Sequence, residues 1–98
     1  MNEKYIQTLR TMIQTQYKCP SRYSQTIKVK EESDGKILFE GNVELFDLGG
    51  HPTARQCYAW GTKKEDGRME YATALNPPAK SAAEAVRGHL QAQGAAAK

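Results

Sequence analysis

The sequence has few of the residues from which disulfides, metal sites or catalytic roles are usually inferred. Two cysteines and two histidines occur in 98 residues, too few for a disulfide framework and a poor basis for a zinc site. No run of about 18 apolar residues is present, so no helix is expected to cross a membrane. The first 18 residues also lack the apolar core of a secretion signal. We therefore expect free thiols, a cytoplasmic location, no cofactor and no metal.

Catalytic and nucleotide-binding motifs are missing as well, because no glycine-rich phosphate loop follows a strand. His51 is the residue on which a small-molecule-binding or catalytic role would depend, and only Cys57 and His89 remain to join it as metal ligands. We interpret the Gly-Gly-His-Pro segment at 49–52 as a structural turn and Cys57 as a small buried hydrophobe. Five acidic residues are interpreted as a solvated face: Glu31, Glu32, Asp34, Glu40 and Glu44.

The charge is bipolar rather than uniformly basic. Six basic residues and one acidic residue lie in 1–30, whereas 31–47 contain six acidic residues and one basic residue. The net charge of the whole chain is +3. A nucleic-acid-binding protein usually concentrates Lys and Arg on one face, so this distribution disfavours such a role without excluding a folded basic patch.

The length predicts one domain at 1–94, followed by a disordered tail at 95–98. Apolar residues recur every three or four positions over 5–17, the spacing of an amphipathic helix that ends at Cys19-Pro20. A second helix begins at Ser81 with a Ser-Ala-Ala-Glu capping box and ends before Gly94.

Between the helices, alternating apolar and polar residues predict four strands. Their ranges are 25–32, 37–48, 54–62 and 68–75. Asp34-Gly35 is a typical tight-turn sequence between the first two strands. The short connections predict an α+β fold, α-β-β-β-β-α, with an antiparallel meander sheet and both helices on one face.

The third and fourth strands suggest what the open face of that sheet carries. Because helices pack closely over small side chains, we place Cys57, Ala59, Ala72 and Ala74 beneath them. The opposite face would then be an aromatic platform of Tyr58, Trp60, Met69 and Tyr71. An exposed apolar patch of this kind usually marks a binding site. The alternative is that the faces are reversed and the aromatic residues form the core.

Three functions follow from these patterns. The first is a non-enzymatic domain that binds a protein partner, or a second copy of itself as a homodimer, through the aromatic platform. The second is nucleic-acid binding, with bases stacked on the platform and phosphates held by four basic residues: Lys63, Lys64, Arg68 and Lys80. The third is a small-molecule-binding or catalytic subunit that uses His51.

Two family resemblances accompany these interpretations. The Ala-Lys-Ser-Ala-Ala segment at 79–83, with the helix-strands-helix order, resembles the double-stranded-RNA-binding domain. Where that family has a phosphate-binding Lys-Lys pair, this chain has Asn76 and Pro77, so only Lys80 corresponds. The resemblance therefore implies an outline of the fold and not its function. The pattern G-N-V-E-x-F-x-L-x-G-H-P followed by C-Y-A-W resembles small uncharacterised bacterial proteins and implies no mechanism.

Overall fold

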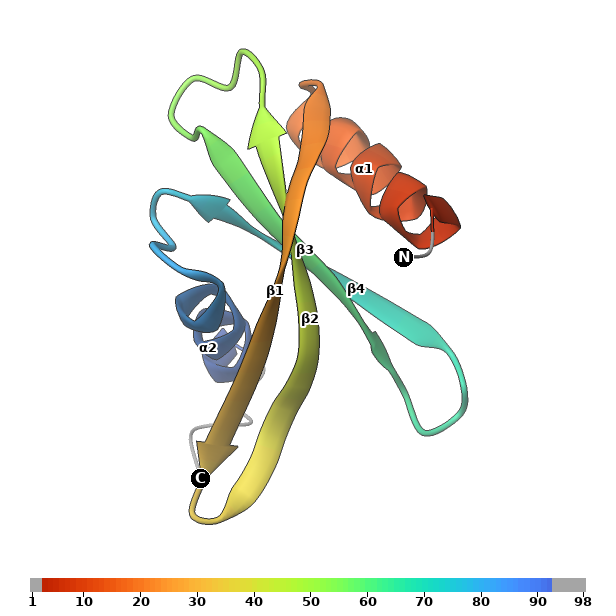
Figure 1. The fold of residues 1–98 in the computed structure, drawn as a ribbon, viewed down its shortest axis with the longest axis vertical. Coiled ribbons are helices and arrows are strands. Elements are labelled where there is room, and N and C mark those ends of the chain that lie inside the picture. Colours follow the sequence, from red (N-terminus) through yellow and green to blue (C-terminus); the bar gives the residue numbers. More distant parts are fainter. Residues whose placement is uncertain (1–2, 93–98) are drawn as a thin grey trace.

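Two helices flank a four-stranded antiparallel sheet in the order that the sequence predicts (Figure 1). The computed structural model describes residues 3–92. The neighbour order within the sheet is β1-β2-β3-β4, which confirms the α+β class and the meander. The predicted tail at 95–98 and the stop at Gly94 lie outside the described residues. The elements are α1 (Glu3–Tyr17), β1 (Ser21–Ser33), β2 (Lys36–Leu48), β3 (Gln56–Lys63), β4 (Met69–Asn76) and α2 (Ala82–Ala92).

Local sequence signals explain where several elements begin and end. Asp34 and Gly35 have φ of 53° and 78°, the positive values that the tight β1–β2 turn requires. At the start of α2, the Ser81 hydroxyl accepts a hydrogen bond from the Glu84 N–H at 3.1 Å. The Glu84 carboxylate in turn accepts one from the Lys80 N–H at 3.1 Å. The capping residues thus satisfy backbone donors that the first turn of a helix leaves free.

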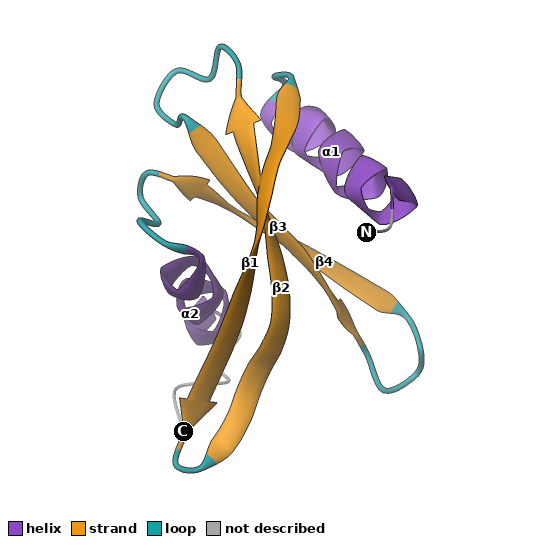
Figure 2. Ribbon diagram, in the orientation of Figure 1, coloured by secondary structure: helices purple, strands orange, loops and turns teal. Residues whose placement is uncertain are grey.

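The sheet is continuous at its centre and divided at one end. The β2–β3 ladder pairs only residues 44–47 with 56–59, although β2 itself is 13 residues long. Beyond this short ladder the β1–β2 hairpin and the β3–β4 hairpin diverge, as Figure 2 shows. The four residue pairs at the centre therefore connect two hairpin arms.

The helices lie on opposite faces of the sheet, so the prediction that they share one face is wrong. Leu9 and Ile13 of α1 cluster with Phe46, Cys57 and Ala59. Val86 and Leu90 of α2 belong to a second cluster, which contains Tyr58 and Trp60. Successive residues of a strand point to opposite faces, so the two clusters of β3 residues lie on different sides.

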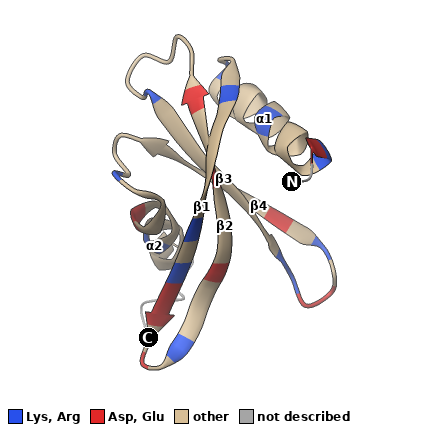
Figure 3. Ribbon diagram, viewed as in Figure 1, with Lys and Arg blue, Asp and Glu red and all other residues tan. Residues whose placement is uncertain are grey.

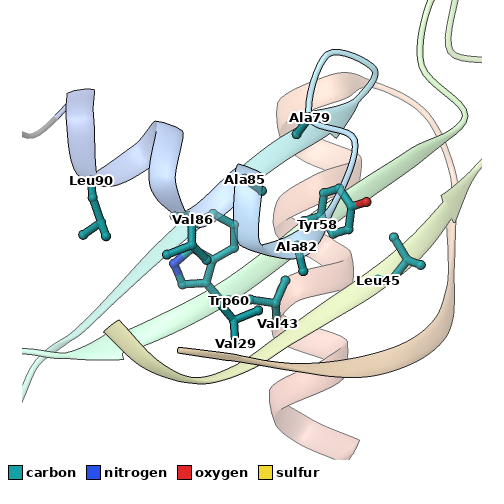
Figure 4. Close-up of a cluster of buried hydrophobic side chains, with 11 residues drawn as sticks. Val29, Val43, Leu45, Tyr58, Trp60, Ala79, Ala82, Ala85, Val86 and Leu90 are labelled. Carbon is teal, nitrogen blue, oxygen red and sulfur yellow. The ribbon is translucent and has the colours of Figure 1, made fainter. Parts of the chain in front are cut away.

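Complementary side-chain sizes explain this arrangement. The first turns of α2 and the loop before it present alanines to the sheet, and these small residues pack over the large rings of Tyr58 and Trp60 (Figure 4). The α1 helix presents Leu9 and Ile13, which pack over the small Cys57 and Ala59. Close packing needs large residues opposite small ones. Each face of β3 therefore suits a different helix.

Candidate functional site

The predicted aromatic platform does not form. Tyr58 and Trp60 are only 4% and 1% exposed, because α2 covers them. The Trp60 ring packs edge-on against Phe39 and His89, with ring centroids 6.4 Å and 5.7 Å away. The reversed-face alternative, in which these aromatic residues belong to the core, is therefore correct for Tyr58 and Trp60.

Met69 and Tyr71 lie on the other face of the sheet. The β3–β4 register pairs Trp60 with Ala72 and Gly61 with Tyr71, so Tyr71 shares a face with Gly61 and not with Trp60. A Cβ atom on Gly61 would come within 2.8 Å of the Met69 side chain and 3.0 Å of the Tyr71 ring. A side chain at position 61 would therefore displace Met69 and Tyr71, which cross β3 over the glycine.

The four predicted phosphate-binding residues do not converge. Lys63, Lys64 and Arg68 lie at the β3–β4 turn, whereas Lys80 follows the opposite end of β4, about 23 Å along the strand. Within the turn, Lys64 pairs with Glu70 at 2.9 Å and Arg68 pairs with Asp66 at 2.7 Å. Residues 63–70 contain three basic and three acidic side chains. Carboxylates thus neutralise two of the four basic residues that were expected to hold phosphates.

His51 lies in the loop between β2 and β3 and forms hydrogen bonds within it. Its Nδ1 accepts hydrogen bonds from the backbone N–H groups of Thr53 at 3.1 Å and Ala54 at 2.9 Å. Its ring also contacts Tyr17 edge-on, with centroids 6.0 Å apart. Within residues 3–92, no group of three or more His, Cys, Asp and Glu side chains is arranged to hold a metal ion. This geometry is that of a structural turn.

Glu44 is the polar residue whose position the sequence pattern misplaced. It was assigned to a solvated face, yet it is 4% exposed beneath α1. The Thr26 hydroxyl donates a hydrogen bond to its carboxylate, and the Tyr23 hydroxyl bonds Thr26 at 2.6 Å. Burial of the Tyr5 phenol raises its pKa, and the nearby Glu44 carboxylate adds to the effect. The alternation of β2 predicts the face correctly but does not reveal that a helix covers it.

Cys57 is buried, as the sequence predicts. Burial raises the pKa of its thiol to about 12, so the fraction of reactive thiolate at pH 8 is on the order of one in ten thousand. We expect Cys57 in the native protein to resist a thiol-labelling reagent at pH 8 for hours. In denaturant both cysteines should react within minutes, which provides the control. Rapid labelling of Cys57 in the native protein, located by peptide mass spectrometry, would contradict its assignment to the core.

An open groove follows the outer edge of β4. It encloses about 540 Å³ and extends from Tyr17 of α1, past Thr73, Ala74 and Leu75, to one side of α2. The Tyr17 hydroxyl bonds the Thr73 hydroxyl at 2.8 Å and forms one end of this β4-edge groove. The α2 side consists mainly of small residues, with one histidine and one glutamate: Glu84, Ala85, Gly88, His89 and Ala92.

Backbone hydrogen-bonding groups of β4 point outward along this edge. Asn76 C=O accepts from Arg55 N–H on the β3 side, whereas Leu75 C=O accepts from Ala79 N–H on the outer side. Because successive residues direct these groups to alternate sides, those of Tyr71 and Thr73 point outward as well. In the described part of the chain, no group bonds to the outward N–H and C=O of these two residues. They are available to an added strand.

The two outer edges of the sheet differ in their protection. Strand β1 is interrupted by two register shifts, between Tyr23 and Gln25 and between Glu31 and Glu32. Charged side chains and bulges are common devices against unwanted strand pairing. In β4, residues 71–76 carry no charge and the strand pairs without a register shift (Figure 3). The charged residues of β1 are Arg22, Lys28, Lys30, Glu31 and Glu32.

The chain matches no protein-family model, no curated protein and no solved structure. Among residues 3–92, no helix has both the length and the apolar character needed to span a membrane. The β4-edge groove was not predicted from the sequence, although two signals for it are present. These signals are the uncharged run at 71–76 and a glycine within α2.

Proposed function

We propose that this chain is a protein-interaction domain that binds an extended segment along the outer edge of β4. The observation that carries the proposal is the outward-facing backbone groups of Tyr71 and Thr73, of which Thr73 lines an open groove. An added strand gains main-chain hydrogen bonds at such an edge, and side-chain pockets beside it provide specificity. This mode retains the expected protein-binding role and transfers it from a sheet face to a sheet edge.

The groove offers different surroundings to alternate side chains of a bound segment. Side chains on one face would meet Tyr17, Thr73 and Leu75, whereas those on the other face would meet the small residues of α2. Successive side chains of an extended segment point to opposite faces. The groove therefore favours segments in which small residues alternate with larger ones.

Proline at position 73 tests the proposal through the backbone. Thr73→Pro removes an outward N–H without removing a β3–β4 ladder bond, and proline is tolerated on such an edge. Peptides selected from a random displayed library against the wild-type protein should bind Thr73→Pro at least about tenfold more weakly, as measured by calorimetry.

Thr73→Val is the matched control, because it keeps the backbone N–H and removes only the hydroxyl, which bonds Tyr17 and Gln16. Its peptide affinity should stay near that of the wild type. Circular dichroism should show that both variants retain the fold. Selected peptides that bind Thr73→Pro and the wild type equally, or a library that yields no binder, would overturn the proposal.

A further inference from the structure

A glycine lies in the interior of α2, at the wall of the β4-edge groove. Gly88 is exposed, and a Cβ atom built on it would meet no other atom within 4 Å. Glycine weakens a helix interior relative to alanine, and the packing of the single chain gives no reason for it here. A glycine in a helix allows another backbone to approach closely. Gly88 therefore points to a partner that packs tightly against α2.

We propose that this partner is a second copy of the chain, paired antiparallel through β4 about a two-fold axis at Ala72. The inference rests on the proposed strand-binding function and specifies the partner. In this register, Tyr71 faces Thr73 of the second copy, and the symmetric pair repeats the contact. Each pair of outward-facing residues exchanges two backbone hydrogen bonds. All the free edge groups of Tyr71 and Thr73 are thereby satisfied.

The charges along β4 are compatible with pairing to itself. Glu70 faces Ala74 of the second copy in this register, and the two Glu70 side chains are about 13 Å apart along the strands, beyond the screening length at physiological salt. The central residues carry no charge. The same edge therefore accepts its own copy without like-charge repulsion.

Pairing β4 with β4 also limits the assembly to two copies. Pairing β4 of one copy with β1 of another would leave a free edge at each end and build a filament. The charges and register shifts of β1 oppose that contact. A dimer through two β4 strands leaves only the protected β1 edges at its ends. The sheet would then contain eight strands.

The two-fold axis places both α2 helices on the same side of this extended sheet. Beneath them, β4 contributes Ala72 and Ala74, whose small side chains allow the helices to approach over the junction. The helix residues that face the groove are also small, including Gly88 and Ala92. Helices whose contacts are made by small residues approach most closely within the usual range of about 8–10 Å. Gly88 thus acquires the close partner that it lacks in one chain.

Two variants separate this dimer from a monomer. Gly88→Ala should raise the thermal midpoint of the monomer, because alanine favours the helix. It should also weaken dimerisation by about tenfold or more, because each methyl group occupies the space of the opposing helix. Thr73→Pro should weaken dimerisation at least as much, and Thr73→Val should leave it within a few fold of the wild type.

Sedimentation equilibrium from about 10 µM to about 500 µM measures these dissociation constants. A wild-type protein with twice the monomer mass, weakened by Gly88→Ala and Thr73→Pro, would support the proposal. A protein that stays monomeric, or a dimer whose dissociation constant neither substitution changes, would overturn it. The peptide measurements separate the failure of the dimer from the failure of the strand-binding function. If selected peptides bind a protein that stays monomeric, strand binding at β4 is supported and the second copy is excluded as the partner.

Discussion

Replacing Trp60 by Ala is expected to lower the free energy of unfolding by about 3–5 kcal/mol, the usual cost of truncating a fully buried aromatic residue. Trp60 is 1% exposed and contacts residues from β2, α2 and β4 in one cluster. Its removal would leave a cavity at the point where α2 meets the sheet. Domains of this size are stable by about 5–15 kcal/mol, so the loss is a large part of the total.

Urea unfolding followed by far-ultraviolet circular dichroism measures this loss, since the substitution removes the single tryptophan that fluorescence would report. Met69→Ala is the control, because Met69 is 43% exposed and a surface truncation usually changes stability by less than about 0.5 kcal/mol. A Trp60→Ala variant with the wild-type urea midpoint would contradict the assignment of Trp60 to the core. It would instead support the prediction that Trp60 lies on an exposed aromatic platform.

Raising the pH from 9 to 11 is expected to lower the free energy of unfolding by about 2 kcal/mol through Cys57 alone. Its pKa rises from 9.0 to about 12 in the native state because the thiol is buried. Between these values the unfolded chain has released the proton and the native chain still holds it, so stability falls as the pH rises. The slope approaches 1.36 kcal/mol per pH unit. Burial also raises the pKa of Tyr5 and Tyr17, which act in the same direction above pH 10.

Urea titrations at several pH values test this linkage. Cys57→Ala should lose most of the pH dependence between 9 and 10, where the tyrosines of the unfolded chain only begin to ionise. Cys19→Ala replaces the other buried cysteine and should retain that dependence. Equal slopes in the wild type and Cys57→Ala would show that another group controls alkaline unfolding.

Local chemistry explains why the element order was predictable. The capping residues at Ser81 and Glu84 and the turn at Asp34-Gly35 act on neighbouring backbone groups, so the signal and its consequence lie within a few residues. Period-two alternation in β3 also separated Cys57 and Ala59 from Tyr58 and Trp60 correctly. Both kinds of signal can be read without knowing which elements pack together.

Contacts between distant segments explain what could not be predicted. The face shared by β3 and β4 depends on their register, and a shift of one residue reverses every side chain. The observed pairing of Trp60 with Ala72 places Tyr71 on the other face, contrary to the expected platform. The burial of Glu44 has the same origin, because it depends on where α1 packs. The β4-edge groove likewise forms only when both helices are in place.

The positions of the helices on opposite faces impose an order on folding during synthesis. The α1 helix is made before the sheet, but its buried residues Leu9 and Ile13 pack on Cys57 and Ala59, which are added more than 40 residues later. At a synthesis rate of about 5–20 residues per second, the apolar side of α1 stays without its packing partners for several seconds. Trp60 must then wait for Val86 and Leu90, which are added at least 26 residues later. The nascent chain therefore presents one uncovered apolar surface after another to chaperones before either core is complete.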